Sequence, residues 1–232
     1  MNSFLPCLAL GAVVLLTVGC GGEDDPAPGD ELAGDGGTVI AALGDSITAG
    51  SPGYDPDPAA RVAFGFGDDE RSSFGYWAEK ADPEGLEIRN CGVFGERTDE
   101  IAARLEECAV DADGVIVQGG INDIAQRYDV GRAAENLRGI VQEAKALGLP
   151  VAITDVLPWN NGYPVADPQI RAMNLLIADI AAEERIPLLP FHDTLEDPDA
   201  PGRMKAELTA DGDHPSVEGY RLLGERAFKL PG

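Results

Sequence analysis

A serine stands at the end of a short apolar run near the start of the chain. The run Val39–Leu43 has the character of a buried strand, and Gly44, Asp45 and Ser46 follow it directly. Gly44 allows a sharp turn, and the side chain of Asp45 can accept hydrogen bonds from the amides of that turn. A serine in this place points into open space, beside backbone N–H groups that could hold an anion. The same three residues also occur in ordinary turns at strand ends.

A histidine preceded by an acid lies near the C-terminus, in Asp211-Gly212-Asp213-His214-Pro215. A serine hydroxyl is a poor nucleophile until a base takes its proton, and that base is usually a histidine oriented by a carboxylate. Asp211 can fold back to the second ring nitrogen of His214. Asp213 is the rival for that role, and the segment would also cap the last helix. We interpret the second histidine, His192, as structural.

Two further residues could stabilise the charge that forms when an ester is attacked. The carbonyl oxygen becomes negative, and loss of one fixed donor typically costs about 3 kcal/mol of barrier. The backbone N–H groups of Ser46 and Gly95 and the side-chain amide of Asn122 are the natural donors. Taken alone, Gly95 is a turn glycine and Asn122 is a helix cap.

Strands and helices alternate from about Thr38 to the C-terminus, and no internal repeat is visible. Apolar runs predict strands, and helical spacing predicts helices, with Thr98 as an N-cap. This alternation predicts an α/β fold with a five-stranded parallel sheet, helices on both faces and ligands at the carboxyl ends of the strands. The expected strands are 39–43, 86–91, 114–118, 150–154 and 187–189, and the main expected helices are 98–108, 131–147, 167–184 and 215–228.

Four segments, in order along residues 39–218, resemble the SGNH hydrolases, also called the GDSL esterase/lipase family. They are Gly44-Asp45-Ser46, Gly95 with its flanks, Gly120-Ile121-Asn122-Asp123 and Asp211-x-x-His214. Ile47 stands where the family usually has leucine. The resemblance implies a flavodoxin-like three-layer α/β/α sandwich and metal-free hydrolysis of carboxylic esters with no cofactor. Its implied catalytic residues are Ser46, Asp211 and His214, and its implied oxyanion hole is Ser46, Gly95 and Asn122.

Several activities remain open within this resemblance. The bacterial lysophospholipase/thioesterase members and the acetyl esterases that act on carbohydrate are the nearest types, and nothing in the sequence separates them. An acyltransferase to a sugar or lipid hydroxyl would use the same residues. A non-catalytic surface binding module is a third hypothesis, although binding alone does not need Ser46, Gly95, Asn122, Asp211 and His214 together.

The N-terminal part has the pattern of an exported protein. Residues 1–20 read as a signal peptide, whose ending Thr17-Val18-Gly19-Cys20 is similar to a bacterial lipobox with Cys20 as the lipidation site. The alternative is plain secretion. Residues 21–37 predict a solvated acidic tether, and residues 38–232 predict the catalytic domain. We therefore expect a cell-envelope lipoprotein, at the outer membrane or cell surface, or a periplasmic or secreted protein.

The charge balance restricts the partners. The formal net charge is −24, from 41 acidic and 17 basic side chains. Nucleic acid and a bare anionic membrane surface both bind a positive protein face, so we expect neither as a partner. We expect a monomer that acts on a small-molecule, glycan or lipid ester and meets a membrane only through a possible N-terminal lipid.

Five aromatic residues in loops are candidates for a substrate pocket. Tyr54, Phe64 and Phe66 lie in a long insertion after Ser46, and Trp159 and Tyr163 follow the fourth strand. They either wall an acyl or aryl pocket or pin the loops down. The acidic residues of the insertion lack the spacing of a calcium loop.

The sequence leaves the pairing of Cys91 and Cys108 open. An exported protein permits a disulfide. A continuous helix over 98–108 would carry Cys108 about 15 Å from the top of the second strand, and a disulfide needs Cα atoms within about 7 Å. The bridge could form if the helix packs back over that strand, or if Cys91 lies lower in the strand than its top.

Overall fold

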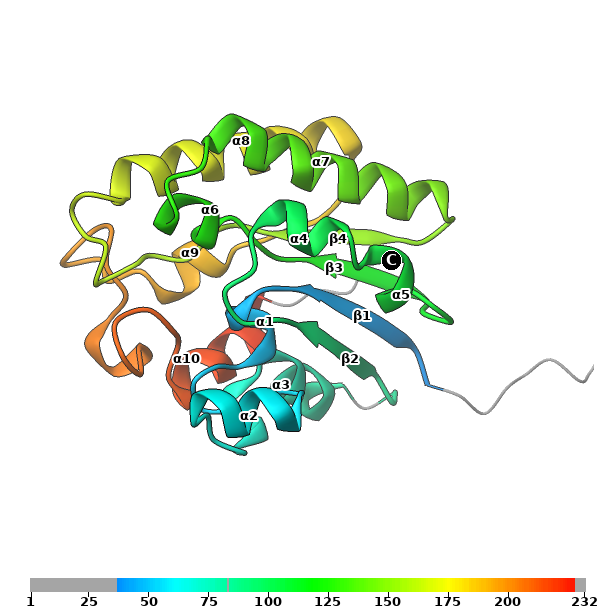
Figure 1. The fold of residues 1–232 in the computed structure, drawn as a ribbon, viewed down its shortest axis with the longest axis horizontal. Coiled ribbons are helices and arrows are strands. Elements are labelled where there is room, and N and C mark those ends of the chain that lie inside the picture. The colour runs from blue at the N-terminus through cyan, green and yellow to red at the C-terminus, as the bar shows by residue number, and fades with distance from the viewer. Residues whose placement is uncertain (1–36, 83, 228–232) are drawn as a thin grey trace, which may run out of the picture. The chain divides into compact units, whose positions relative to one another are not determined.

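The computed structural model describes residues 37–82 and 84–227 (Figure 1). The expected signal peptide, Cys20 and residues 21–36 of the tether lie outside the described residues. The strands are β1 (Val39–Gly44), β2 (Glu87–Gly92), β3 (Gly114–Val117), β4 (Val151–Thr154) and β5 (Leu188–Leu189). The helices are α1 (Ser46–Ala49), α2 (Pro58–Phe64), α3 (Phe74–Ala81), α4 (Thr98–Ala102), α5 (Leu105–Cys108), α6 (Ile121–Ala125), α7 (Val130–Ala146), α8 (Asp167–Glu184), α9 (Phe191–Leu195) and α10 (Val217–Leu222). Short 3₁₀ turns are η1 (Glu70–Ser72) and η2 (Ala206–Leu208), and a π-helical turn, η3 (Leu223–Ala227), follows α10.

The five strands form one parallel sheet in the order β2-β1-β3-β4-β5. Leu43 of β1 lies opposite Cys91 of β2 on one side and Val117 of β3 on the other. Because all strands run the same way, their carboxyl ends lie along one edge of the sheet. This arrangement confirms the predicted α/β fold and its five-stranded parallel sheet.

Alternate residues of the strands enter two separate cores. In β1, Ala41 and Leu43 pack on the side of α4, α5, α7 and α8, whereas Ile40 and Ala42 pack on the side of α3, α9 and α10 (Figure 1). Strands buried on both faces are apolar along their whole length, which explains the continuous runs in the sequence. The two helical layers enclose the sheet as the predicted sandwich.

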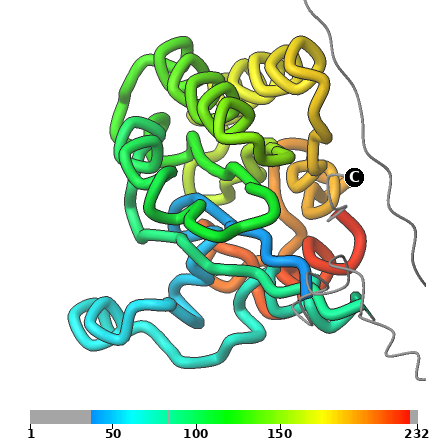
Figure 2. The backbone as a smooth tube through the Cα atoms, turned by 90° about the vertical axis from the view of Figure 1, so that its right-hand side faces the viewer, coloured from blue at the N-terminus to red at the C-terminus, as the bar shows by residue number. Residues whose placement is uncertain are grey.

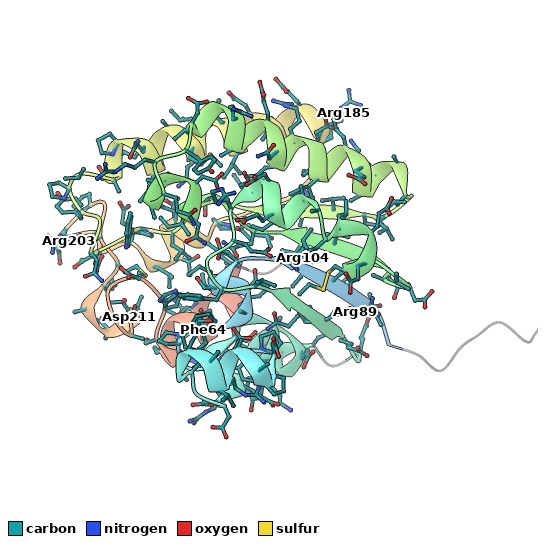
Figure 3. The ribbon with its side chains drawn as sticks, viewed as in Figure 1. Phe64, Arg89, Arg104, Arg185, Arg203 and Asp211 are labelled. Atoms are coloured by element: carbon teal, nitrogen blue, oxygen red, sulfur yellow. A yellow bond between two sulfur atoms is a disulfide. The ribbon has the colours of Figure 1, made fainter. Side chains whose placement is uncertain are left out.

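The helix expected over residues 98–108 is interrupted, and this interruption settles the cysteine pairing. It divides into α4 and α5, with Ala103 and Arg104 between them. Cys91 and Cys108 are joined as a disulfide with Cα atoms 6.1 Å apart (Figure 3). The estimate of 15 Å was wrong because it assumed one straight helix, and the break brings α5 back against β2.

Two helix caps also differ from expectation. Arg97 rather than Thr98 is the N-cap of α4, and Thr98 is its first helical residue. Ser216, whose hydroxyl accepts from the N–H of Gly219, caps α10, so the segment 211–215 is not the cap. Within the described residues, no helix is both long and apolar enough to cross a membrane.

Candidate active site

Ser46 is the first residue of α1, directly after β1. Asp45 caps this helix, because its carboxylate accepts a hydrogen bond of 2.9 Å from the N–H of Ile47. The side-chain oxygen of Gln118, at the end of β3, accepts from the N–H of Asp45 at 3.1 Å and from the hydroxyl of Thr48 at 2.8 Å. The N–H of Ser46 lies at a helix start, where amides have no acceptor within the helix. The turn therefore holds the serine rigidly and leaves a donor beside it.

His214 connects Ser46 to Asp211. Its Nε2 lies 3.0 Å from Ser46 Oγ, and its Nδ1 lies 2.9 Å from Asp211 Oδ2. The other carboxylate oxygen of Asp211 accepts from the N–H groups of Asp213 and His214, at 2.8 Å each. Burial raises the pKa of Asp211, but the hydrogen bonds from the imidazole and these amides outweigh it and hold the pKa below its ordinary value. The carboxylate is thus ionised beside the imidazole.

Asp213 points away from the histidine and is held by the loop after β4. Its carboxylate accepts a hydrogen bond of 2.5 Å from the indole N–H of Trp159. In the same loop, the side-chain amide of Asn161 donates to the backbone oxygen of Asp211, and its backbone N–H donates to the oxygen of Gly212. Trp159 therefore holds the loop after β4 against the turn that carries His214. Holding a loop in place was one of the two roles expected for this residue.

Gly95 and Asn122 come together at the loop that follows β2. Gly95 has a φ of +82°, a left-handed conformation that favours glycine. The side-chain amide of Asn122 donates to the backbone oxygen of Glu96 at 2.9 Å, which places the amide beside this loop. The N–H of Val93 donates to the oxygen of Gly44 at 3.0 Å, which ties the loop to the serine turn. Gly120, with a φ of +113°, is the N-cap of α6, so Asn122 is not the cap.

Arg104 is a residue of this site that the sequence analysis missed. Its guanidinium donates to the backbone oxygens of Gly44 (3.1 Å) and Cys91 (2.7 Å), and it forms an ion pair of 2.6 Å with Glu96. It therefore joins the strand before Ser46 to the loop that carries Gly95. No local pattern marks such a residue, because its three partners lie 8, 13 and 60 residues away from it in the sequence.

Asp123 supports the same loop from α6. Its carboxylate accepts from both the N–H (3.0 Å) and the hydroxyl (2.8 Å) of Thr98. The role of Thr98 is therefore to pair with Asp123, not to cap α4. Burial raises the pKa of Asp123, partly offset by these bonds.

Asp45, in the serine turn, and Tyr220, in α10, are both fully buried. Burial raises the pKa of Asp45 to about 6, although the hydrogen bonds from Ile47 and Gln118 oppose this. Burial also raises the pKa of Tyr220 well above its ordinary value, and the negative charges of Asp45 and Asp211 add to the effect. Among the described residues, Asp45 Oδ2 and the Tyr220 hydroxyl have no hydrogen-bond partner.

His192 lies in α9, away from this series of hydrogen bonds. It is buried, and its N–H donates to Asp155 at 2.7 Å. With Asp193 and Glu196 it forms the one group of three possible metal ligands in the described part of the chain. The guanidinium of Arg171 already lies 3.7 Å from Glu196, and a cation beside that carboxylate disfavours a second one.

The aromatic residues of the two loops contact different neighbours. Phe64 and Phe66 stack on each other and contact Phe94, the residue before Gly95. Tyr54 lies under the guanidinium of Arg61, and Tyr163, after β4, lies under that of Arg203. Only the phenylalanines are thereby linked to the catalytic histidine candidate, since the ring of Phe94 lies 6.4 Å from that of His214.

A parallel α/β/α sheet with a serine, a histidine and an aspartate in hydrogen-bonded series at its carboxyl edge is typical of serine hydrolases. Comparison of the sequence with models of protein families identifies the family within this class. Residues 42–222 match the GDSL-like Lipase/Acylhydrolase family, and the chain belongs to that family. It is accordingly a carboxylic ester hydrolase by class. No curated protein sequence matches this chain.

Solved structures share the fold at low sequence identity. A lipolytic protein of the G-D-S-L family from Desulfitobacterium hafniense is 22% identical with a TM-score of 0.67, covering 81% of this chain and 96% of that one. A lipase/acylhydrolase from Enterococcus faecalis is 22% identical with a TM-score of 0.64, covering 81% and 91%. An acetyl xylan esterase from Geobacillus stearothermophilus is 22% identical with a TM-score of 0.62, covering 83% and 93%.

Proposed function

We propose that this protein is a serine esterase that hydrolyses acyl or acetyl esters through an acyl-enzyme on Ser46. The observation that carries the proposal is the series of hydrogen bonds from Asp211 Oδ2 through the imidazole of His214 to Ser46 Oγ. A hydroxyl, a base and an orienting carboxylate in this order form the arrangement that activates serine. Family membership supports the same reaction class.

The first half of the reaction forms the acyl-enzyme. Ser46 Oγ attacks the ester carbonyl carbon while His214 Nε2 takes its proton, and Asp211 stabilises the resulting imidazolium. The carbonyl oxygen becomes negative and accepts hydrogen bonds from the N–H groups of Ser46 and Gly95 and from the amide of Asn122. The bond between the carbonyl carbon and the alcohol oxygen then breaks, and the alcohol leaves with the proton from His214.

The second half returns the free enzyme. His214 takes a proton from water, whose oxygen attacks the acyl carbon, and the bond to Ser46 Oγ breaks as the serine regains the proton. The products are one carboxylic acid and one alcohol, and no cofactor enters the balance. An added alcohol that attacks in place of water would make the protein an acyltransferase.

The test is hydrolysis of p-nitrophenyl acetate, butyrate, octanoate and palmitate by the protein and by Ser46→Ala. We expect turnover that Ser46→Ala abolishes, and the profile over the four esters gives the acyl length. Turnover that survives in Ser46→Ala would reject Ser46 as the nucleophile. A reaction that yields mainly a new ester when an alcohol is added would favour the acyltransferase.

A further inference from the structure

Three phenylalanine rings form a surface cluster beside the candidate active site, and we call Phe64, Phe66 and Phe94 the aromatic patch. Their ring centroids are 5.0 to 5.4 Å apart in all three pairs. Phe64 is 60% exposed and Phe94 is 39% exposed. Two of the rings come from the insertion after Ser46, and the third comes from the loop that carries Gly95.

The aromatic patch does not contribute to either core. No residue of α2, which carries Phe64, is buried, and α2 projects from the rest of the described domain (Figure 2). Of the nine large hydrophobic residues exposed in the described part, four lie in these two segments: Val62, Phe64, Val93 and Phe94. Apolar side chains gathered on a surface mark a binding site more often than scattered ones do.

Hydrogen bonds to the better-buried part of the insertion hold its exposed part in place. The N–H of Phe66 donates to the oxygen of Arg61, and the N–H of Gly67 donates to the oxygen of Pro52, at 3.1 and 2.9 Å. The guanidinium of Arg61 donates to the oxygen of Asp55 at 2.6 Å. The two rings of the insertion are therefore positioned before any ligand arrives, which lowers the entropic cost of binding.

The position of Phe94 identifies which part of an ester reaches the aromatic patch. In the proposed reaction, His214 gives a proton to the departing alcohol oxygen, so the alcohol leaves on the histidine side of Ser46. The ring of Phe94 lies on that side, 6.4 Å from the imidazole. The rings of Phe64 and Phe66 both contact Phe94 and enlarge the apolar surface there. Phe64 and Asp211 lie toward the same edge of the sheet (Figure 3).

We propose that the aromatic patch is the binding site for the alcohol part of the substrate, and that it selects esters of alcohols that carry an apolar ring. This inference rests on the proposed esterase function. Offset and edge-to-face contacts with the three rings would hold such a ring, whereas a short alkyl alcohol would not reach them.

The test compares kcat/KM for benzyl acetate and ethyl acetate, which share the acyl group and differ in the ring of the alcohol. We expect the protein to prefer benzyl acetate and Phe64→Ala to lower that preference about 3- to 10-fold, the effect of losing one aromatic contact. The matched control is Leu175→Ala, a residue of α8 that is at least as exposed as Phe64 and lies outside the two segments that carry the aromatic patch, which should keep the preference. Phe94→Ala is the second variant, with the same expected direction.

Two results would overturn the proposal. The first is an unchanged preference in both phenylalanine variants. The second is a change in the ratio between ethyl hexanoate and ethyl acetate instead, which would assign the aromatic patch to the acyl chain.

A binding measurement separates this proposal from the esterase function. Saturation-transfer NMR with benzyl alcohol should detect binding to the Ser46→Ala protein, and Phe64→Ala in that background should weaken it. Binding without any ester turnover in the parent protein would reject the esterase function alone. Turnover that depends on Ser46, with benzyl alcohol binding equally to both proteins, would reject the aromatic patch alone.

Discussion

The guanidinium of Arg104 donates a hydrogen bond of 3.1 Å to the backbone oxygen of Gly44, two residues before Ser46. The same guanidinium pairs with Glu96, whose backbone oxygen accepts the amide of Asn122. One side chain thus sets the distance between the serine turn and two of the proposed oxyanion donors. Arg104 touches no reacting atom, so it is a positioning residue.

Replacing Arg104 should therefore affect the chemical step more than substrate binding. We expect Arg104→Met to lower kcat by about 10- to 100-fold, because small misplacements of reacting groups have effects of this size, with a smaller change in KM. Arg104→Lys should recover little activity, since an ammonium cannot reproduce the planar fork. Steady-state kinetics on p-nitrophenyl acetate would measure both values.

Arg89 provides the matched control for Arg104. Its guanidinium also donates hydrogen bonds to backbone oxygens, but the acceptors are those of Cys108 and Val110 rather than those that Arg104 binds. Arg89→Met should lower stability without the selective loss of kcat. Equal losses of kcat in both variants would mean that Arg104 acts through stability alone.

Removing the amide of Asn122 should raise the barrier of the reaction. We expect Asn122→Ala to lower kcat by about 10²- to 10³-fold, the usual effect of losing one oxyanion donor. Gln126→Ala is the control, because its exposed amide also bonds the loop, at the oxygen of Gly95, without serving as a proposed donor. A similar loss in both variants would show that Asn122 matters only for holding the loop.

The pH dependence of stability should reveal the buried carboxyl of Asp45. Its pKa is about 6 in the native protein against an ordinary value of 3.8, so the native state binds the proton more tightly than the unfolded state. The resulting stabilisation, about 3 kcal/mol, is complete below the ordinary value and is lost as the pH rises through about 6.

Asp45→Asn should remove this pH dependence, because asparagine can still cap α1 but carries no charge. Relative to the parent protein, the free energy of unfolding of the variant should rise by about 2 kcal/mol between pH 4.5 and pH 8. Chemical denaturation at the two pH values measures it. Asp57→Asn, at the exposed N-cap of α2, is the control and should not show this rise. A difference independent of pH would contradict the prediction.

The disulfide between Cys91 and Cys108 should stabilise the edge of the sheet that carries β2. Its two cysteines are 17 residues apart in sequence, and closing a loop of that length contributes about 3 kcal/mol in the chain-entropy description. We expect the variant with both Cys91→Ala and Cys108→Ala to lose about that much free energy of unfolding. Reducing agent should destabilise the parent protein and leave the double variant unchanged, whereas equal stability of the oxidised and reduced parent would refute the prediction.

The alternation of strands and helices made much of the fold predictable. Parallel strands end at one edge, so residues that follow different strands, such as Ser46 and Asn122, must approach each other whatever the details of the loops. Asp211 and His214 are three residues apart, and a single turn joins them. For these residues the local pattern and the sheet geometry are sufficient.

Long-range contacts were less predictable. The break between α4 and α5 contains no glycine or proline, and Arg104, which lies in the break, contacts Gly44, Cys91 and Glu96. The partner of Trp159, Asp213, lies 54 residues away in the sequence. Such contacts depend on how the layers pack, which no short segment encodes.

The sequence by itself determined the parallel sheet and the chemical groups that its carboxyl edge presents, because apolar periodicity and the order of motifs act locally along the chain. Only the tertiary structure decided that Cys91 meets Cys108, that Trp159 donates to Asp213, and that Phe94 joins Phe64 and Phe66. Each of these depends on where separate segments meet in space, and packing and hydrogen bonding across the whole domain set those meeting points.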